Sequence, residues 1–132
     1  MENLISQVKS KRINGINVTV PFKNTIIPYV DQLSTEAEKT KSVNTIYLNN
    51  DKVIGHNTDI DGFEKAINKI NFKVSDKRIF ILGAGGVVPS IIYALNKMGA
   101  FNIFISNRTK AKAQMVKDIF NNLSILDWGD VP

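Results

Sequence analysis

The sequence predicts an α/β fold composed of two partial domains, residues 1–60 and residues 61–132. In the second domain, apolar runs alternate with helical periods in the order strand, helix, strand, helix, strand. A cluster of glycines follows the first of these strands directly and opens the first helix. These two observations are typical of the first half of a Rossmann-type, doubly wound parallel sheet. The first domain has shorter strands and one hairpin, which predicts a partial α/β unit of another kind.

The first domain begins with a helix and a short strand. Leu4, Ile5 and Val8 recur at helical spacing ahead of a basic run, which predicts the end of an amphipathic helix. Residues 13–20 then alternate apolar and polar side chains and predict a strand. Pro21 ends that strand because proline cannot donate to a sheet ladder.

Helical periods and a hairpin fill the remainder of the first domain. Residues 24–33 carry apolar side chains at helical spacing, and a capping-box sequence beginning at Thr35 predicts a further helix. Strands at 43–48 and 53–57 enclose a polar turn and form a hairpin. A helix over about 58–70 follows, with its first or second residue as the N-cap.

The second domain has the clearer pattern. Its first strand is a continuous apolar run of the kind that is buried in parallel sheets. The expected strands are 78–82, 101–106 and 124–126, and the expected helices are 87–98 and 110–121.

The glycine cluster is Gly83-Ala84-Gly85-Gly86. Gly83 permits a tight turn and Gly85 allows close approach of a pyrophosphate, while the N-terminus of the following helix offers N–H groups to phosphates. The third glycine of the usual dinucleotide motif is replaced by Val88. From this motif alone, a structural glycine turn therefore stays open beside a cofactor loop.

Cations follow the second strand of this domain, where an NAD-binding unit usually places an acidic residue on the ribose 2′-hydroxyl. This chain has Asn107, Arg108 and Thr109, with Lys112 one turn later. The planar guanidinium of Arg108 can hold a 2′-phosphate, and Lys112 adds charge. We therefore predict NADP as the cofactor; the alternative is a solvated helix start that Thr109 caps.

Five motifs in one order carry a family resemblance. They are GINVTVPFK at 15–23, VNT at 43–45, GHNTD at 55–59, GAGG at 83–86 and NRT at 107–109. With these motifs the chain resembles the shikimate dehydrogenase family, over nearly all of its length.

The resemblance implies roles for single residues. Lys23 and Asp59 match the family's catalytic pair, and Thr19 and Asn44 join them at positions that bond the hydroxyls of shikimate. The implied cofactor contacts are Gly83, Ala84, Gly85, Gly86, Asn107, Arg108, Thr109 and Lys112. The implied reaction is the reversible, NADPH-dependent reduction of 3-dehydroshikimate to shikimate.

The chemistry of that reaction suits a lysine beside a carboxylate. Reducing a ketone by hydride needs a proton donor at the developing alkoxide, and the reverse direction needs a base. Lys23 can serve in both roles, and we expect Asp59 to orient its ammonium and to bond a substrate hydroxyl. Burial would lower the lysine pKa and Asp59 would raise it, so the net direction stays open.

Parts of the family pattern have no counterpart in this sequence. They are a Ser-x-Ser motif that grips the substrate carboxylate and the segment that contacts the nicotinamide. We therefore expect an internal piece of a two-domain enzyme, without meaningful turnover by itself. Two alternatives stay open: an NAD(P)-dependent quinate/shikimate dehydrogenase, which favours an acidic residue near Arg108, and a non-catalytic NADP-binding module.

Composition narrows the remaining classes. Without cysteine there is no disulfide and no thiolate metal site, and no metal is predicted. The net charge of +5 comes from lysines spread along the chain, which does not favour nucleic-acid binding. No apolar run reaches the roughly 18 residues of a membrane span. We expect a cytoplasmic protein with a small-molecule partner, and the oligomeric state is left open.

Overall fold

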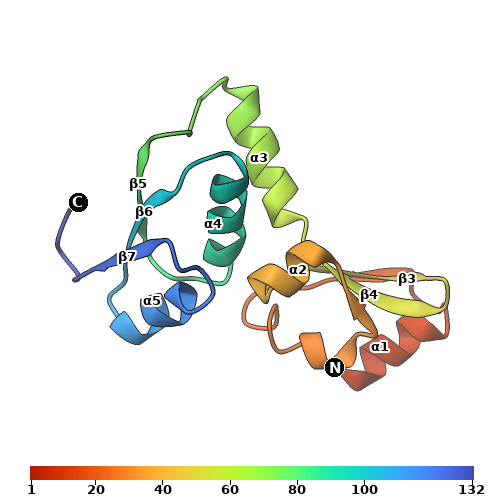
Figure 1. Cartoon of the computed structure of the whole chain (residues 1–132). Helices are drawn as coiled ribbons and strands as arrows, with labels where there is room; N and C mark the ends of the chain where they lie inside the picture. Colours follow the sequence, from red (N-terminus) through yellow and green to blue (C-terminus); the bar gives the residue numbers. More distant parts are fainter. The chain divides into compact units, whose positions relative to one another are not determined.

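A computed structural model describes residues 1–132 and divides them into two compact units, Met1–Asp59 and Ile60–Pro132 (Figure 1). Each unit has its own sheet and its own hydrophobic core. The packing within each unit therefore positions the candidate site residues of that unit.

The first unit is built around a four-stranded sheet of order β1-β3-β4-β2. Its strands are β1 (Gly15–Asn17), β2 (Gln32–Leu33), β3 (Thr45–Asn49) and β4 (Lys52–His56). The central strand β3 pairs antiparallel with β1 and β4, whereas β2 pairs parallel with β4. The helices of this unit are α1 (Glu2–Lys9), the 3-10 helix η1 (Ile27–Tyr29) and α2 (Thr35–Thr40).

A small aliphatic core joins the helices of the first unit to its sheet. Its fully buried members are Val8, Ala37, Val43, Ile46 and Val53. Gly55 of β4 lies against this core, and a Cβ atom there would stand 3.0 Å from the side chains of both Leu33 and Val43. Only a residue without a side chain fits this position without displacing its neighbours.

The predicted strand over 13–20 is too long. Strand β1 covers Gly15–Asn17 alone, because its partner β3 begins at Thr45, opposite Asn17. The N–H of Val18 still donates to the carbonyl of Asn44 at 2.8 Å, and beyond it the chain leaves the sheet. The apolar alternation continues past the point where the pairing partner ends.

The predicted helix over 24–33 is wrong. This segment contains the short helix η1, with Pro28 inside it, and then strand β2, which pairs with Ile54 and Gly55 of β4. Proline removes a backbone donor, and parallel pairing with β4 satisfies the backbone that a helix would otherwise have bonded. The next helix, α2, is capped by Ser34 instead of Thr35: the Ser34 Oγ accepts the Ala37 N–H at 3.2 Å.

The second unit has a parallel sheet of order β5-β6-β7. The strands are β5 (Arg78–Leu82), β6 (Asn102–Ser106) and β7 (Leu123–Leu126). The helices are α3 (Asp59–Lys69), which begins at the boundary of the units, α4 (Val88–Lys97) and α5 (Lys110–Lys117). Helix α5 ends before the predicted residue 121, and the other elements lie close to their predicted ranges.

One face of this sheet packs against α4 and α5. The buried residues of this layer are Val88, Ile92, Leu95, Ile103, Ile105, Ala113, Val116 and Leu123. The repeated order of strand, helix and parallel strand confirms the predicted fold class, a partial α/β domain followed by half of a Rossmann-type sheet. No helix of the chain is both long enough and apolar enough to cross a bilayer.

Candidate functional site

Lys23 lies in the loop that follows β1. Its backbone carbonyl accepts the N–H of Val43 at 2.8 Å, so the loop is tied to the segment that leads into β3. The Lys23 side chain is 13% exposed, which leaves its ammonium largely shielded and still within reach of a small molecule. This backbone hydrogen bond therefore fixes the position from which the Lys23 side chain extends.

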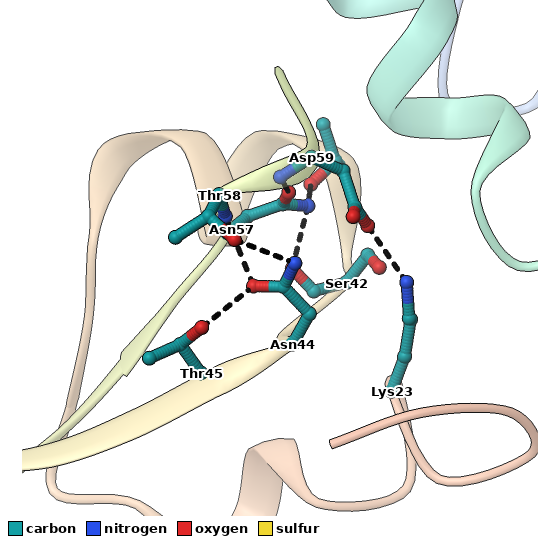
Figure 2. A network of polar contacts seen from close by, with 8 residues as sticks. Lys23, Ser42, Asn44, Thr45, Asn57, Thr58 and Asp59 are labelled. Atoms are coloured by element: carbon teal, nitrogen blue, oxygen red, sulfur yellow. Dashed lines mark hydrogen bonds and ion pairs between the residues drawn. The ribbon is translucent and has the colours of Figure 1, made fainter. Parts of the chain in front are cut away.

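Asp59, the first residue of α3, faces Lys23. Its Oδ2 lies 2.7 Å from the Lys23 Nζ, and its side chain is 24% exposed (Figure 2). The two residues are 36 positions apart in the sequence, yet they form a close ion pair. Partial burial strengthens such a contact because less water screens it. The structure thus brings together the two residues that the resemblance made catalytic.

Asn44 belongs to the same group of polar side chains. Its Oδ1 accepts the Thr58 N–H at 2.9 Å and the Thr45 hydroxyl at 3.1 Å, while its Nδ2 donates to the Thr58 Oγ1 at 2.9 Å. Thr19 lies exposed one residue beyond the Val18 N–H that bonds the Asn44 carbonyl. The predicted contacts of Asn44 and Thr19 with substrate hydroxyls stay predictions.

Asn57 is the member of this group that the sequence did not single out. Only 1% of it is exposed, and its Oδ1 accepts the Asp59 N–H at 3.0 Å. A side-chain acceptor at the start of α3 thus comes from Asn57, and the predicted N-cap, Thr58 or Asp59, stays a prediction. An asparagine that bonds the backbone two residues later forms an Asx-turn, a signal that was present in the GHNTD motif.

The glycine loop of the second unit joins β5 to α4. Gly83 has φ +102°, a conformation that side chains rarely adopt, and its N–H donates to the carbonyl of Ser106 at 2.8 Å. A Cβ atom placed on Gly83 or on Gly85 would meet no other atom within 4 Å. The remainder of the chain therefore leaves the backbone of this loop open at both positions.

Asn107 connects this loop to the turn after β6. Its Oδ1 accepts the Ala84 N–H at 3.1 Å, and its Nδ2 donates to the carbonyl of Thr109 at 2.8 Å. Asn107 therefore holds the glycine loop and the turn that carries Arg108 in one arrangement. Thr109 occupies the N-cap position of α5 but forms no side-chain capping bond, so the structure does not show the cap that the alternative interpretation required.

The cations after β6 are exposed to solvent. Arg108 and Lys112 are both exposed, and Lys110 between them pairs with Asp127 at 2.6 Å. The hydrogen bond from Lys110 to Asp127 raises the pKa of Lys110, because it favours the ammonium form. The nearest carboxylate along the chain after β7, Asp127, is thus engaged by Lys110.

Two family models match most of the chain. The model described as "Shikimate dehydrogenase substrate binding domain" matches residues 1–46, and the model described as "Shikimate / quinate 5-dehydrogenase" matches residues 64–128. The chain belongs to the shikimate dehydrogenase family. Lys23 and Asn44 lie inside the first match and the glycine loop inside the second, whereas Asn57 and Asp59 lie between the two.

Relatives and solved structures agree with this membership. The shikimate dehydrogenase (NADP(+)) of Pelagibacter ubique is 49% identical over 130 residues, which are 98% of this chain and 49% of the relative. The crystal structure of shikimate dehydrogenase from Aquifex aeolicus matches with a TM-score of 0.86 and 40% identity, over 96% of this chain and 47% of that one.

A third similarity is to a structure that holds ligands. It is the Thermus thermophilus shikimate 5-dehydrogenase in complex with NADP(H) and shikimate, with a TM-score of 0.84 and 27% identity over 96% of this chain and 47% of that chain. The chain spans about half the length of the relatives that it matches.

Proposed function

We propose that this chain carries the Lys23–Asp59 site and the dinucleotide loop of an NADP-dependent shikimate dehydrogenase. The reaction is the reversible reduction of 3-dehydroshikimate to shikimate. The observation that carries the proposal is the 2.7 Å ion pair between Lys23 and Asp59, two residues that come from separate family motifs. Its proposed partner is a small molecule in the cytoplasm.

The two charged side chains divide the proton chemistry between them. When bound, the dinucleotide supplies or accepts the hydride. The Lys23 ammonium donates a proton to the oxygen of the reacting carbonyl, and in the reverse direction the neutral amine takes it back. Asp59 orients the ammonium through their hydrogen bond and accepts a bond from a substrate hydroxyl. Thr19 and Asn44 supply further polar contacts for the remaining hydroxyls.

The preference for NADP rests on the turn after β6. Arg108 and Lys112 are exposed there, and no carboxylate occupies the position that an NAD-binding unit uses for the ribose. The guanidinium of Arg108 matches the geometry of a 2′-phosphate, and the open space at Gly83 and Gly85 accommodates the diphosphate. Asn107 supports both by holding the two turns together.

A second candidate is a quinate/shikimate dehydrogenase. It is favoured by the description of the second family model, which names both substrates. Quinate and shikimate share the hydroxyls that Lys23, Asn44 and Asp59 would contact, so these residues do not separate them. Arg108 favours the NADP-dependent enzyme over an NAD-dependent one.

A chimera tests the proposal. Residues 1–132 replace the matching half of the Pelagibacter ubique relative, and formation of NADPH or NADH is followed with shikimate or quinate and with NADP+ or NAD+. We expect turnover with shikimate and NADP+, and none from residues 1–132 alone. Faster turnover with quinate and NAD+ would favour the second candidate. A folded chimera that binds NADP+ without turning over either substrate would favour the non-catalytic module.

A further inference from the structure

Asn57 is a buried amide whose two ends bond different parts of the first unit. Its Oδ1 accepts the Asp59 N–H at 3.0 Å. Its Nδ2 donates to the Thr40 Oγ1 at 3.2 Å and to the Ser42 carbonyl at 3.0 Å. Figure 2 shows Asn57 between Ser42 and Asp59, at the junction of β4 and α3. One side chain therefore connects the start of α3 to the segment between α2 and β3.

The peptide unit between Ser42 and Val43 is bonded at both of its polar atoms. Its carbonyl, from Ser42, accepts the amide of Asn57, and its N–H, from Val43, donates to the carbonyl of Lys23 at 2.8 Å. The C=O and N–H of a trans peptide unit point in opposite directions from one rigid plane. Asn57 and the backbone of Lys23 thus lie at opposite edges of the same planar peptide unit.

This arrangement forms a closed path through the ion pair. It runs from Lys23 through the 42–43 peptide to Asn57, from Asn57 to the backbone of Asp59, and across the 2.7 Å contact back to Lys23. The backbones of both charged residues are therefore connected by hydrogen bonds to the same 42–43 peptide unit. A shift of Asn57 would move Asp59 and leave Lys23 in place.

We propose that Asn57 is a positioning residue that sets the contact between Lys23 and Asp59 through the 42–43 peptide. Its importance for catalysis rests on the proposed function, whereas its effect on the ion pair does not. The Oδ1 of Asn57 holds the backbone N–H of Asp59 and so sets the direction of the Asp59 carboxylate. Its amide fixes the distance of that helix start from the Lys23 loop.

The test measures the Lys23 side chain in the complete 132-residue chain by NMR. The Cε and Nζ signals of Lys23 report its ion pair, and Asp59→Asn supplies the reference for a broken pair. We expect Asn57→Ala to displace the Lys23 signals in the direction of Asp59→Asn. The double variant should displace them no further than Asp59→Asn does, because both changes act on the same contact.

A matched control and a milder variant separate positioning from general support. Asn68→Ala alters an exposed asparagine of the same helix and should leave the Lys23 signals unchanged. Asn57→Ser keeps an acceptor for the Asp59 N–H and loses the amide donors. It should therefore displace the Lys23 signals less than Asn57→Ala does. If Asn57→Ala does not fold, Asn57→Ser carries the test by the same signals.

Two results would overturn the proposal: Lys23 signals that stay at wild-type positions in Asn57→Ser and Asn57→Ala, or displacements that add to that of Asp59→Asn in the double variant. Failure of the proposed function has a different signature. Shikimate would then leave the signals of Lys23 and Asn44 unmoved in the chimera with the Pelagibacter ubique relative, while the dependence of Lys23 on Asn57 persists.

Discussion

The Lys23–Asp59 site and the glycine loop represent two ways of preparing for a ligand. In the first, opposite charges already meet at 2.7 Å and a 1% exposed asparagine bonds the backbone beside them. In the second, the cationic side chains Arg108 and Lys112 after β6 are exposed to solvent, and the glycines leave open space. The proposed proton transfer depends on alignment, and the two side chains proposed for it already lie in contact. Phosphate binding depends on charge and room, and both can be provided by an open surface.

The largest effect is expected at the Lys23–Asp59 site. Lys23→Ala in the chimera should reduce kcat for shikimate about 10²- to 10⁴-fold, because a general acid–base group contributes in that range. The affinity for NADP+, measured by titration, should stay at the chimera's own value. A loss of turnover within a few-fold would show that Lys23 is not the proton donor.

The next largest effect is expected at the turn after β6. Arg108→Ala should weaken NADP+ binding roughly 10- to 100-fold, since a charge-assisted contact to a phosphate is worth about 1.5–3 kcal/mol. Binding of NAD+, which has no 2′-phosphate, should change little. Isothermal titration of both dinucleotides to the variant checks this, with Lys65→Ala as a control cation that is exposed on α3. Equal losses for both dinucleotides would contradict a 2′-phosphate contact.

The two regions also differ in how far their sequences predict them. The parallel half was predictable because its strands are apolar runs that alternate with helical periods. In the first unit, strand β2 has two residues and depends on pairing with β4, so no local pattern could reveal it. The role of Asn57 likewise depends on Ser42, 15 positions earlier. Motifs identified the charged pair, and only the three-dimensional contacts identified what holds it.

A smaller effect tests how closely side chains pack around Gly55 of β4 in the first unit. Gly55→Ala should lower the free energy of unfolding by about 1–3 kcal/mol, because the new Cβ would stand 3.0 Å from Leu33 and Val43. Gly62→Ala is the matched control: no atom lies within 4 Å of its added Cβ, and alanine favours a helix by about 0.5–1 kcal/mol. Urea unfolding of both variants measures the difference. Equal stabilities would mean that the side chains around Gly55 move aside at no cost in free energy.

The smallest effect concerns an ion pair of the first unit away from Lys23. The backbone N–H of Val53 and the ammonium of Lys9 both bond Asp31 and lower the pKa of its carboxyl. Because folding lowers this pKa, the ionised carboxylate stabilises the folded state at pH values above the ordinary carboxyl pKa. That contribution is lost as the pH falls through the lowered value. Asp31→Asn should therefore reduce stability modestly at neutral pH and bring it closer to wild type in acid. Thermal unfolding of wild type and variant across the acidic range measures this, and a stability difference that is constant with pH would contradict a lowered Asp31 pKa in the folded state. The Lys9–Asp31 side chains are more exposed than those of Lys23 and Asp59, so the expected change in stability is small.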